Sequence, residues 1–179
     1  GPGILFNITD TEFNGPNWLQ GEIVGNVVSA NAGDGISLLP NINNPDPLGP
    51  FTIDFGRALG DLQRRISNNE IRGNSGAGVP VDLPNFNDFF GLLTGNTISN
   101  NLQGGFDLLA VDNTTEKSVV FDLVIGGEDP SDGNIFDNNA GVGIGLTLQD
   151  TSEGAFTIQN NTITRTRSVG SSKLVRGSG

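Results

Sequence analysis

Apolar residues along this 179-residue chain recur in short pairs that are spaced two positions apart and separated by turn-forming residues. Val79 and Val81 form one such pair, and Ile144 and Leu146 form another. A spacing of two places side chains on one face of an extended strand, whereas a helix repeats every three or four residues. The pattern therefore predicts an all-β fold built from many short strands.

Further strands are predicted where alternating apolar runs precede these pairs. The runs cover residues 4–8, 51–55, 119–123 and 156–158. Glycine, proline, asparagine and aspartate, the residues that tight turns favour, cluster between the predicted strands. Each structural unit is therefore expected to hold about three short strands and three turns.

The strands belong to an internal repeat. Its clearest copy covers residues 66–81. The repeated positions there are occupied by Ile66, Asn69, Ile71, Asn74, Gly78, Val79 and Val81, and the residues between them vary from copy to copy. The pattern recurs over residues 23–38, 93–108 and 134–146, and a partial last copy begins at Ile158 and has Thr166 at the second Asn position. A fixed repeat of this kind is typical of solenoid proteins.

Aligned copies place asparagine and glycine in columns. The first asparagine column contains Asn26, Asn69, Asn96, Asn134 and Asn161; the second contains Asn31, Asn74, Asn101 and Asn139; the glycine column contains Gly35, Gly78, Gly105 and Gly143. A side-chain amide both donates and accepts, so stacked asparagines are expected to hydrogen-bond along the axis. Asparagine also tolerates left-handed backbone, and the glycine column is expected at a corner with positive φ.

The spacing of the copies gives the size of one coil. The first asparagines lie 43, 27, 38 and 27 residues apart, so the compact coil has 27 residues and two coils carry insertions. We predict one domain over residues 1–179, a right-handed parallel β-helix of about five coils stacked at ~4.8 Å. Residues 1–2 resemble a protease-cleavage remnant and 177–179 a linker, so we expect a fragment of a larger protein.

The copies resemble the parallel β-helix repeat of pectate-lyase-like proteins. Within them, residues 124–144 are most similar to a coil that recurs in large bacterial secreted and cell-surface proteins. The resemblance covers roughly residues 19–170, and it implies an extracellular or cell-surface location. It does not imply one function, because this fold hosts lyases, hydrolases, epimerases, adhesins and spacers.

Composition and charge exclude several kinds of function. Twenty acidic and 9 basic residues give a net charge of −11, so nucleic acid is not an expected partner, since phosphate binding needs a basic surface. Cysteine and histidine are both absent, which excludes a disulfide framework and a Ser-His-Asp triad. No apolar run approaches the ~20 residues of a membrane span, so membrane insertion is not expected.

Asp82 and Asp107 form the candidate catalytic pair. The repeat places them on the outward side of adjacent coils, two residues and one coil apart, which corresponds to about 8 Å from strand rise and strand spacing. That separation suits two carboxylates flanking a water molecule, as in inverting glycoside hydrolysis. The alternative is that two solvated aspartates of an acidic protein lie this close by chance.

Glu128, Asp129 and Asp132 form the densest acidic loop and are candidate Ca²⁺ ligands. Hard cations prefer several carboxylate and carbonyl oxygens, and three carboxylates within five residues could supply them. The spacing is not that of an EF-hand, however, and the alternative is a polar turn that keeps the solenoid soluble. No other feature requires a cofactor.

Aromatic residues offer a third kind of candidate site. Phe86, Phe89 and Phe90 lie together in the sequence, and an exposed aromatic cluster would stack on sugars. The alternative is that these phenylalanines fill the coil interior. Trp18, near the first coil, is expected to cover an end of the core.

These observations favour a non-catalytic structural or adhesive module that could bind carbohydrate or Ca²⁺. Its expected partners are adjacent domains or coils of the same protein, a polysaccharide, and further copies stacked end to end, because uncapped solenoid ends expose unpaired strands. The alternative is a polysaccharide-degrading hydrolase or lyase of the pectate-lyase-like class, with Asp82 and Asp107 as its acids. A third interpretation is a carbohydrate-binding module that uses the same outer face.

Overall fold

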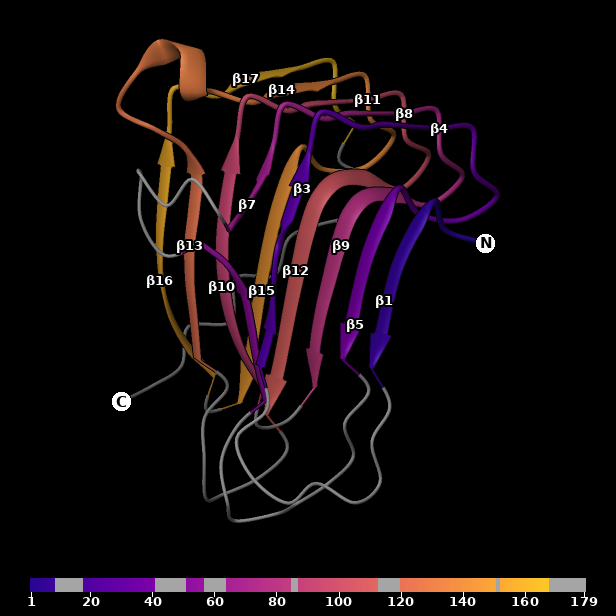
Figure 1. Ribbon diagram of the computed structural model, residues 1–179. Coiled ribbons are helices and arrows are strands. Elements are labelled where there is room, and N and C mark those ends of the chain that lie inside the picture. Colours follow the sequence, from indigo (N-terminus) through magenta and orange to yellow (C-terminus); the bar gives the residue numbers. More distant parts are fainter. Residues whose placement is uncertain are drawn as a thin grey trace.

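The computed structural model describes residues 1–8, 18–40, 51–56, 64–84, 87–112, 120–150 and 152–167. These residues form three parallel β-sheets (Figure 1), and their one helical element is a single 3₁₀ turn, η1 (Pro130–Asp132). The predicted all-β, parallel architecture is therefore confirmed. The arrangement is compatible with a β-helix.

The strands are distributed over the sheets as follows. Sheet A contains β1 (Ile4–Ile8), β5 (Ile36–Pro40), β9 (Ala77–Pro84), β12 (Gly104–Asp112) and β15 (Ile144–Asp150). Sheet B contains β2 (Trp18–Gln20), β3 (Glu22–Val24), β6 (Phe51–Phe55), β7 (Arg65–Ser67), β10 (Asn87–Thr94), β13 (Val120–Gly126) and β16 (Glu153–Gln159). Sheet C contains β4 (Val27–Ser29), β8 (Glu70–Arg72), β11 (Thr97–Ser99), β14 (Ile135–Asp137) and β17 (Thr162–Thr164).

The chain visits the three sheets in a constant order. It passes from sheet B to sheet C to sheet A, as in β10, β11 and β12, and then returns to sheet B one strand further along, as in β13. Each passage corresponds to one copy of the sequence repeat. In Figure 1 the five strands of sheet A lie side by side, with β1 at one edge.

The apolar column of each strand faces the interior shared by the three sheets. In sheet A, Val79 aligns with Phe106, which in turn aligns with Ile144. In sheet C, Ile71, Ile98 and Phe136 align in the same way, and all three are fully buried. The parallel register thus stacks like residues above one another and gives a continuous core.

The first asparagine column is a hydrogen-bonded ladder. The side-chain oxygen of Asn96 accepts from both the backbone N–H and the side-chain amide of Asn69, at 3.0 Å each. Asn96 in turn donates through the same two groups to Asn134 Oδ1, at 2.9 and 2.8 Å. Its second amide proton goes to the Ile66 carbonyl at 2.8 Å, so a buried amide has every proton paired.

The second column repeats this arrangement. Asn74 donates to Asn101 Oδ1 from its backbone and its side chain, and Asn101 donates to Asn139 Oδ1 in the same way. These three asparagines are completely buried. A buried amide is tolerated only when it is hydrogen-bonded, so each rung fixes the position of the next.

The expectation that ladder asparagines take left-handed backbone is wrong. Positive φ occurs one residue earlier, at Asn68, Asn100, Asn138 and Asn160, and at Gly25, Gly73 and Gly95. The left-handed residue turns the chain, and the ladder asparagine that follows it points inward. Asparagine is therefore abundant for two separate reasons, one at the turn and one in the ladder.

The explanation of the glycine column by positive φ is also wrong. Gly35, Gly78, Gly105 and Gly143 do not have positive φ. They are needed because the next repeat lies too close for a side chain. A Cβ on Gly78 would lie 2.4 Å from Ile98 Cγ2 and 2.7 Å from the Gly105 carbonyl oxygen, and one on Gly105 would lie 2.4 Å from the Gly143 oxygen.

The buried rungs should matter more than the exposed end rung. Asn96→Ala leaves two buried donor groups of Asn69 without their Asn96 acceptor, at about 1–3 kcal/mol for each group left unpaired. We expect Asn96→Ala to lower the free energy of unfolding by roughly 3 kcal/mol, as measured by urea denaturation. Asn26→Ala, the same substitution at the exposed end of the column, should cost only about 0.5–1.5 kcal/mol. Equal losses would contradict the ladder's role.

Substitutions at two glycines distinguish the cost of a steric clash with the next repeat from the cost of backbone strain at positive φ. Gly78→Ala places a methyl group against backbone of the next repeat, and overpacking of this kind costs about 3 kcal/mol or more. Gly73→Ala has open space but positive φ, so it should cost about 1–2 kcal/mol. Thermal and urea unfolding of both variants test this order. A Gly78→Ala variant no less stable than Gly73→Ala would contradict the steric explanation.

Candidate functional site

The outward-facing residues of sheet A hold the candidate acids. Asp107 lies between Pro80 of β9 and Gly145 of β15 in the parallel register. Asp82 aligns with Leu109 of β12. The two aspartates therefore lie two residues and one strand apart, as the repeat predicts, and both point away from the core.

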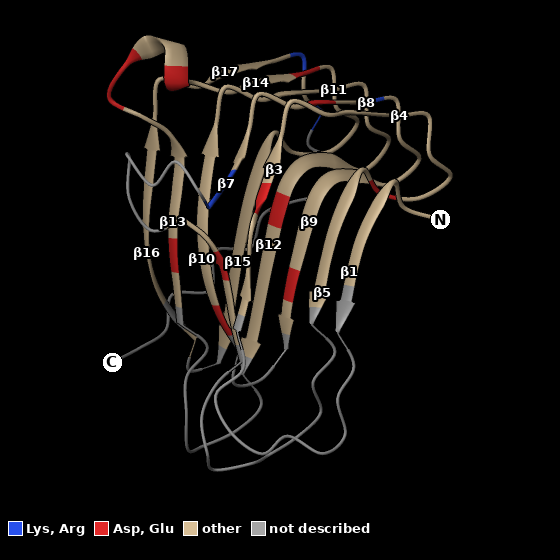
Figure 2. Cartoon of the chain, in the orientation of Figure 1, with Lys and Arg blue, Asp and Glu red and all other residues tan. Residues whose placement is uncertain are grey.

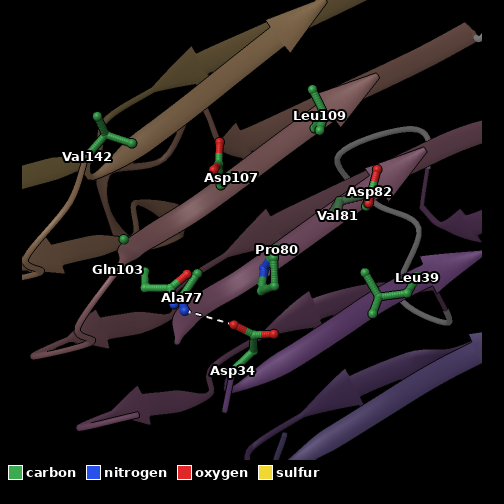
Figure 3. Close-up of a pocket in the computed structure, with 11 residues that line it drawn as sticks. Asp34, Leu39, Ala77, Pro80, Val81, Asp82, Gln103, Asp107, Leu109 and Val142 are labelled. Carbon is green, nitrogen blue, oxygen red and sulfur yellow. Dashed lines mark hydrogen bonds between the residues drawn. The ribbon is translucent and has the colours of Figure 1, made fainter. Parts of the chain in front are cut away.

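Both aspartates line one shallow depression of about 270 Å³ (Figure 3). Its walls come from β5, β9 and β12 and from the turns that precede β5, β12 and β15. The other lining residues are Asp34, Leu39, Ala77, Pro80, Val81, Gln103, Gly104, Leu109 and Val142. The sequence repeat identified two of its three carboxylates; Asp34, in a turn before β5, was not predicted.

Asp34 is fixed in place by hydrogen bonds. Its Oδ1 accepts from the backbone N–H of Ala77 at 2.9 Å, and its Oδ2 accepts from the Ser37 hydroxyl at 3.4 Å. The absence of a side chain at Gly76 makes room for this carboxylate, because a Cβ there would lie 2.0 Å from Asp34 Oδ1. Asp34 therefore links two repeats at the edge of the depression.

Asp107 occupies space that another glycine provides. A Cβ on Gly145 would lie 2.5 Å from Asp107 Oδ1 and 3.0 Å from Val142 Cγ2. The Asp107 carboxylate is thus close to the backbone of β15 and to the apolar Val142. This position shields the carboxylate from part of the surrounding water.

Partial burial changes the acidity of both candidate acids. Desolvation raises the pKa of Asp82 and that of Asp107 above the usual aspartate value. The cause is the loss of water around the charged form, and the depression contributes apolar side chains such as Leu39 and Leu109. A raised pKa makes a carboxyl keep its proton to a higher pH than a free aspartic acid does, and this is the direction that a general acid needs.

The acidic loop has a structural arrangement of its own. Asp129 is the N-cap of η1, and its Oδ1 accepts from the backbone N–H and the hydroxyl of Ser131, at 2.8 Å each. These hydrogen bonds lower the pKa of Asp129. The described residues contain no group of three or more carboxylates placed to hold a metal ion, so Glu128, Asp129 and Asp132 are not brought together as a Ca²⁺ site.

The aromatic residues divide between core and surface. Phe89 is fully buried in the core and Phe90 is half-buried on the outer side of β10. Phe86 lies outside the described residues, as does the side chain of Trp18. An aromatic sugar platform is therefore not formed by Phe89, whose ring fills the interior.

Sequence reasoning missed a buried ion pair on the outer side of sheet B. Asp54 is completely buried, and its Oδ2 accepts from Arg64 Nη1 at 2.7 Å. Its Oδ1 accepts from the backbone N–H of Gly56 at 3.0 Å. The only sequence signal is an acid within an alternating strand and an arginine ten residues later. That signal does not reveal that the position is covered, so it could not have identified the pair.

Charge is distributed unevenly over the sheets. The strands of sheet A contain no lysine or arginine, whereas β9 and β12 carry Asp82 and Asp107 (Figure 2). The described arginines lie in or beside β7, β8 and β17: Arg64, Arg65, Arg72, Arg165 and Arg167. The outer face of sheet A is therefore acidic, and it would repel phosphate or sulfate groups.

The pKa shifts predict opposite pH dependences for two kinds of aspartate. Asp82 and Asp107 have pKa values in the folded protein above the unfolded value of about 3.9. Their ionised forms are therefore less favourable in the folded than in the unfolded protein, and this destabilises the fold at neutral pH. Below pH ~3.9 both states are protonated, and the effect is absent. Replacing either with Asn should raise the free energy of unfolding at pH 7 by at most about 0.5 kcal/mol, given solvent screening. This gain should disappear as the pH approaches 3.9.

Asp137 provides a control of opposite sign. Hydrogen bonds from Arg165 and then Thr164 lower its pKa, so its contribution to stability is present above pH ~3.9 and is lost as the pH falls through the lowered pKa. Asp137→Asn should therefore destabilise the protein at pH 7 and have little effect at the lowest pH. Urea denaturation between pH 2.5 and 7 measures all three variants, and a gain in stability for Asp137→Asn at pH 7 would contradict the assignment.

Comparison with known proteins finds no match among protein-family models, curated proteins or solved structures. Within the described part of the chain, no helix has the length and apolar character needed to cross a membrane. The functional conclusion therefore depends on the geometry of the sheets, the ladders and the depression on sheet A.

Proposed function

We propose that this chain is a right-handed parallel β-helix of about five coils that serves as a non-catalytic structural or adhesive module of a secreted or cell-surface protein. The observation that carries the proposal is the unbroken hydrogen-bonded column from Asn26 to Asn161, which passes through every repeat. The constant order of sheets B, C and A supports the same conclusion.

The physical character of the stack suits a spacer. Five coils at ~4.8 Å give a rod about 24 Å long. Its interior is filled by stacked apolar residues and paired amides, so neighbouring coils hold one another in register. Exposed outward side chains away from the ladder turns do not contact this interior, so such a rod could present different surface groups there.

A second function, polysaccharide hydrolysis, is favoured by one specific observation. Asp82 and Asp107 line the same depression, and burial raises the pKa of both. In an inverting mechanism one protonated carboxyl would give its proton to the glycosidic oxygen as the bond to the sugar carbon breaks. The other carboxylate would take a proton from the attacking water. The third interpretation, a carbohydrate-binding module, would use the same depression without this chemistry.

A reducing-end assay distinguishes module from enzyme. The chain would be incubated at high concentration overnight with neutral and acidic polysaccharides, with and without Ca²⁺, between pH 4 and 8. We expect no product above the level of the blank, because a structural module performs no bond cleavage. Release of product from any polymer would contradict the non-catalytic proposal.

Three variants would identify the source of any activity. Asp82→Asn and Asp107→Asn remove the two candidate acids, and Asp122→Asn is the matched control, because Asp122 lies on β13 of sheet B and not in the depression. Activity that falls at least about a hundredfold in the first two variants and persists in the third would establish the hydrolase. Activity unchanged in all three would remove the assignment to these residues.

A further inference from the structure

The end of the stack formed by β15, β16 and β17 exposes residues of the core column. Leu148, Phe156, Ile158 and Ile163 are 40%, 57%, 41% and 47% exposed. Their register partners one repeat earlier, Ala110, Leu123, Ile125 and Phe136, are all 0% exposed. The two sets occupy equivalent positions, and they differ because no following repeat covers the exposed set within the described residues.

The two ends of the first ladder are complementary in hydrogen bonding. Every internal rung donates its backbone N–H and its side-chain amide to the next Oδ1. At the last rung in the described part of the chain, Asn161 finds no further Oδ1, and its side-chain amide donates to the Gln159 carbonyl at 2.9 Å. At the first rung, Asn26 is exposed and its Oδ1 accepts no hydrogen bond within the described residues. One end therefore offers donors and the other an acceptor.

The strands at the two ends are staggered in a matching way. Sheet A starts one strand before the others, with β1, while sheets B and C continue one strand beyond β15, with β16 and β17. A second copy placed on this end could pair its β1 with β15, its β2 and β3 with β16, and its β4 with β17. Each sheet would then continue in parallel across the junction.

The opposite end can receive the exposed apolar column. Ile4, Phe6 and Leu19 face the core but are only half-buried. A hollow of about 320 Å³ lies between β1 and β4, and it is lined by Ile4 and by Asn26 and Asn31, the first rungs of the two ladders. Apolar surface and unpaired ladder groups thus occur together at both ends, as an interface between copies requires.

We propose that a second copy of this chain stacks head to tail, with its Asn26 end on the Asn161 end of the first copy. This inference rests on the proposed β-helix. The contact joins two different surfaces, so it does not close on itself and further copies can add to form an open fibre. Stacking of two Asn161 ends is disfavoured, because donors would then face donors.

Concentration and salt control the assembly. The net charge of −11 on each copy opposes association, and salt screens that repulsion. By sedimentation velocity and light scattering, the weight-average mass of the 179-residue chain should at least double between low-micromolar and near-millimolar concentration at 0.15 M salt. Association should be weaker at 0.01 M salt. A monomer at every concentration and salt level would overturn the proposal.

A pair of matched variants locates the contact. Ile163→Glu places a charge among the exposed apolar residues at the Asn161 end of the stack. We expect it to raise the dissociation constant of the contact at least about tenfold, which corresponds to 1.4 kcal/mol. Ile135→Glu is the control, because Ile135 is 44% exposed on the outer side of sheet C rather than at the end of the core column. Circular dichroism would verify that both variants fold. Equal loss of association in both would place the contact elsewhere.

A mixing experiment tests the direction of stacking. Asn26→Lys removes the acceptor at one end and Ile163→Glu blocks the other, so each variant alone should remain a monomer. Mixed together, they should form a 1:1 dimer and stop there, because each retains one intact end. Association of Asn26→Lys with itself would indicate Asn161 ends in contact and overturn head-to-tail stacking. None of these outcomes depends on the reducing-end assay, so stacking and the non-catalytic role can fail separately.

Discussion

The structure depends on one interaction, the pairing of a buried asparagine amide with the asparagine of the next repeat. An unpaired amide in this interior would cost more than most single side-chain contacts contribute. Because the Oδ1 of each internal rung accepts two hydrogen bonds, a shift in register by one residue would leave several polar groups buried without partners. The ladders therefore select one register for all three sheets, and the apolar residues alone would not, since many of them are interchangeable.

The glycine column is the steric counterpart of the ladders. Asn101 and Ile98 can lie against Gly78 only because that position has no side chain, and Gly105 has the same relation to Asn139 and Phe136. The close approach brings the backbones of successive repeats near enough for the amide hydrogen bonds. Polar pairing and tight packing consequently occur at the same corner of each repeat.

Much of this fold could be predicted from the sequence, because repetition places equivalent residues in register. The ladder residues and the strands at residues 4–8 and 51–55 follow from spacing. The ion pair of Asp54 with Arg64 could not be predicted, since it depends on a covered outer face that has no repeat signal. The raised pKa of Asp107 could not be predicted either, because it results from the partial burial of the carboxylate in the assembled sheet.

The turn that contains η1 shows how the repeat accommodates extra chain. Leu93 and Ile125 are register partners, but Asn96 follows Leu93 by three positions whereas Asn134 follows Ile125 by nine, and the hydrogen bonds between rungs remain short, at 3.0 and 2.8 Å. The entropy of closing a loop grows only with the logarithm of its length. Foreign peptide segments inserted at the β13–β14 turn would therefore be displayed on the rim at a small cost in stability. The same number of residues added between Asn69 and Asn74 would interrupt both ladders.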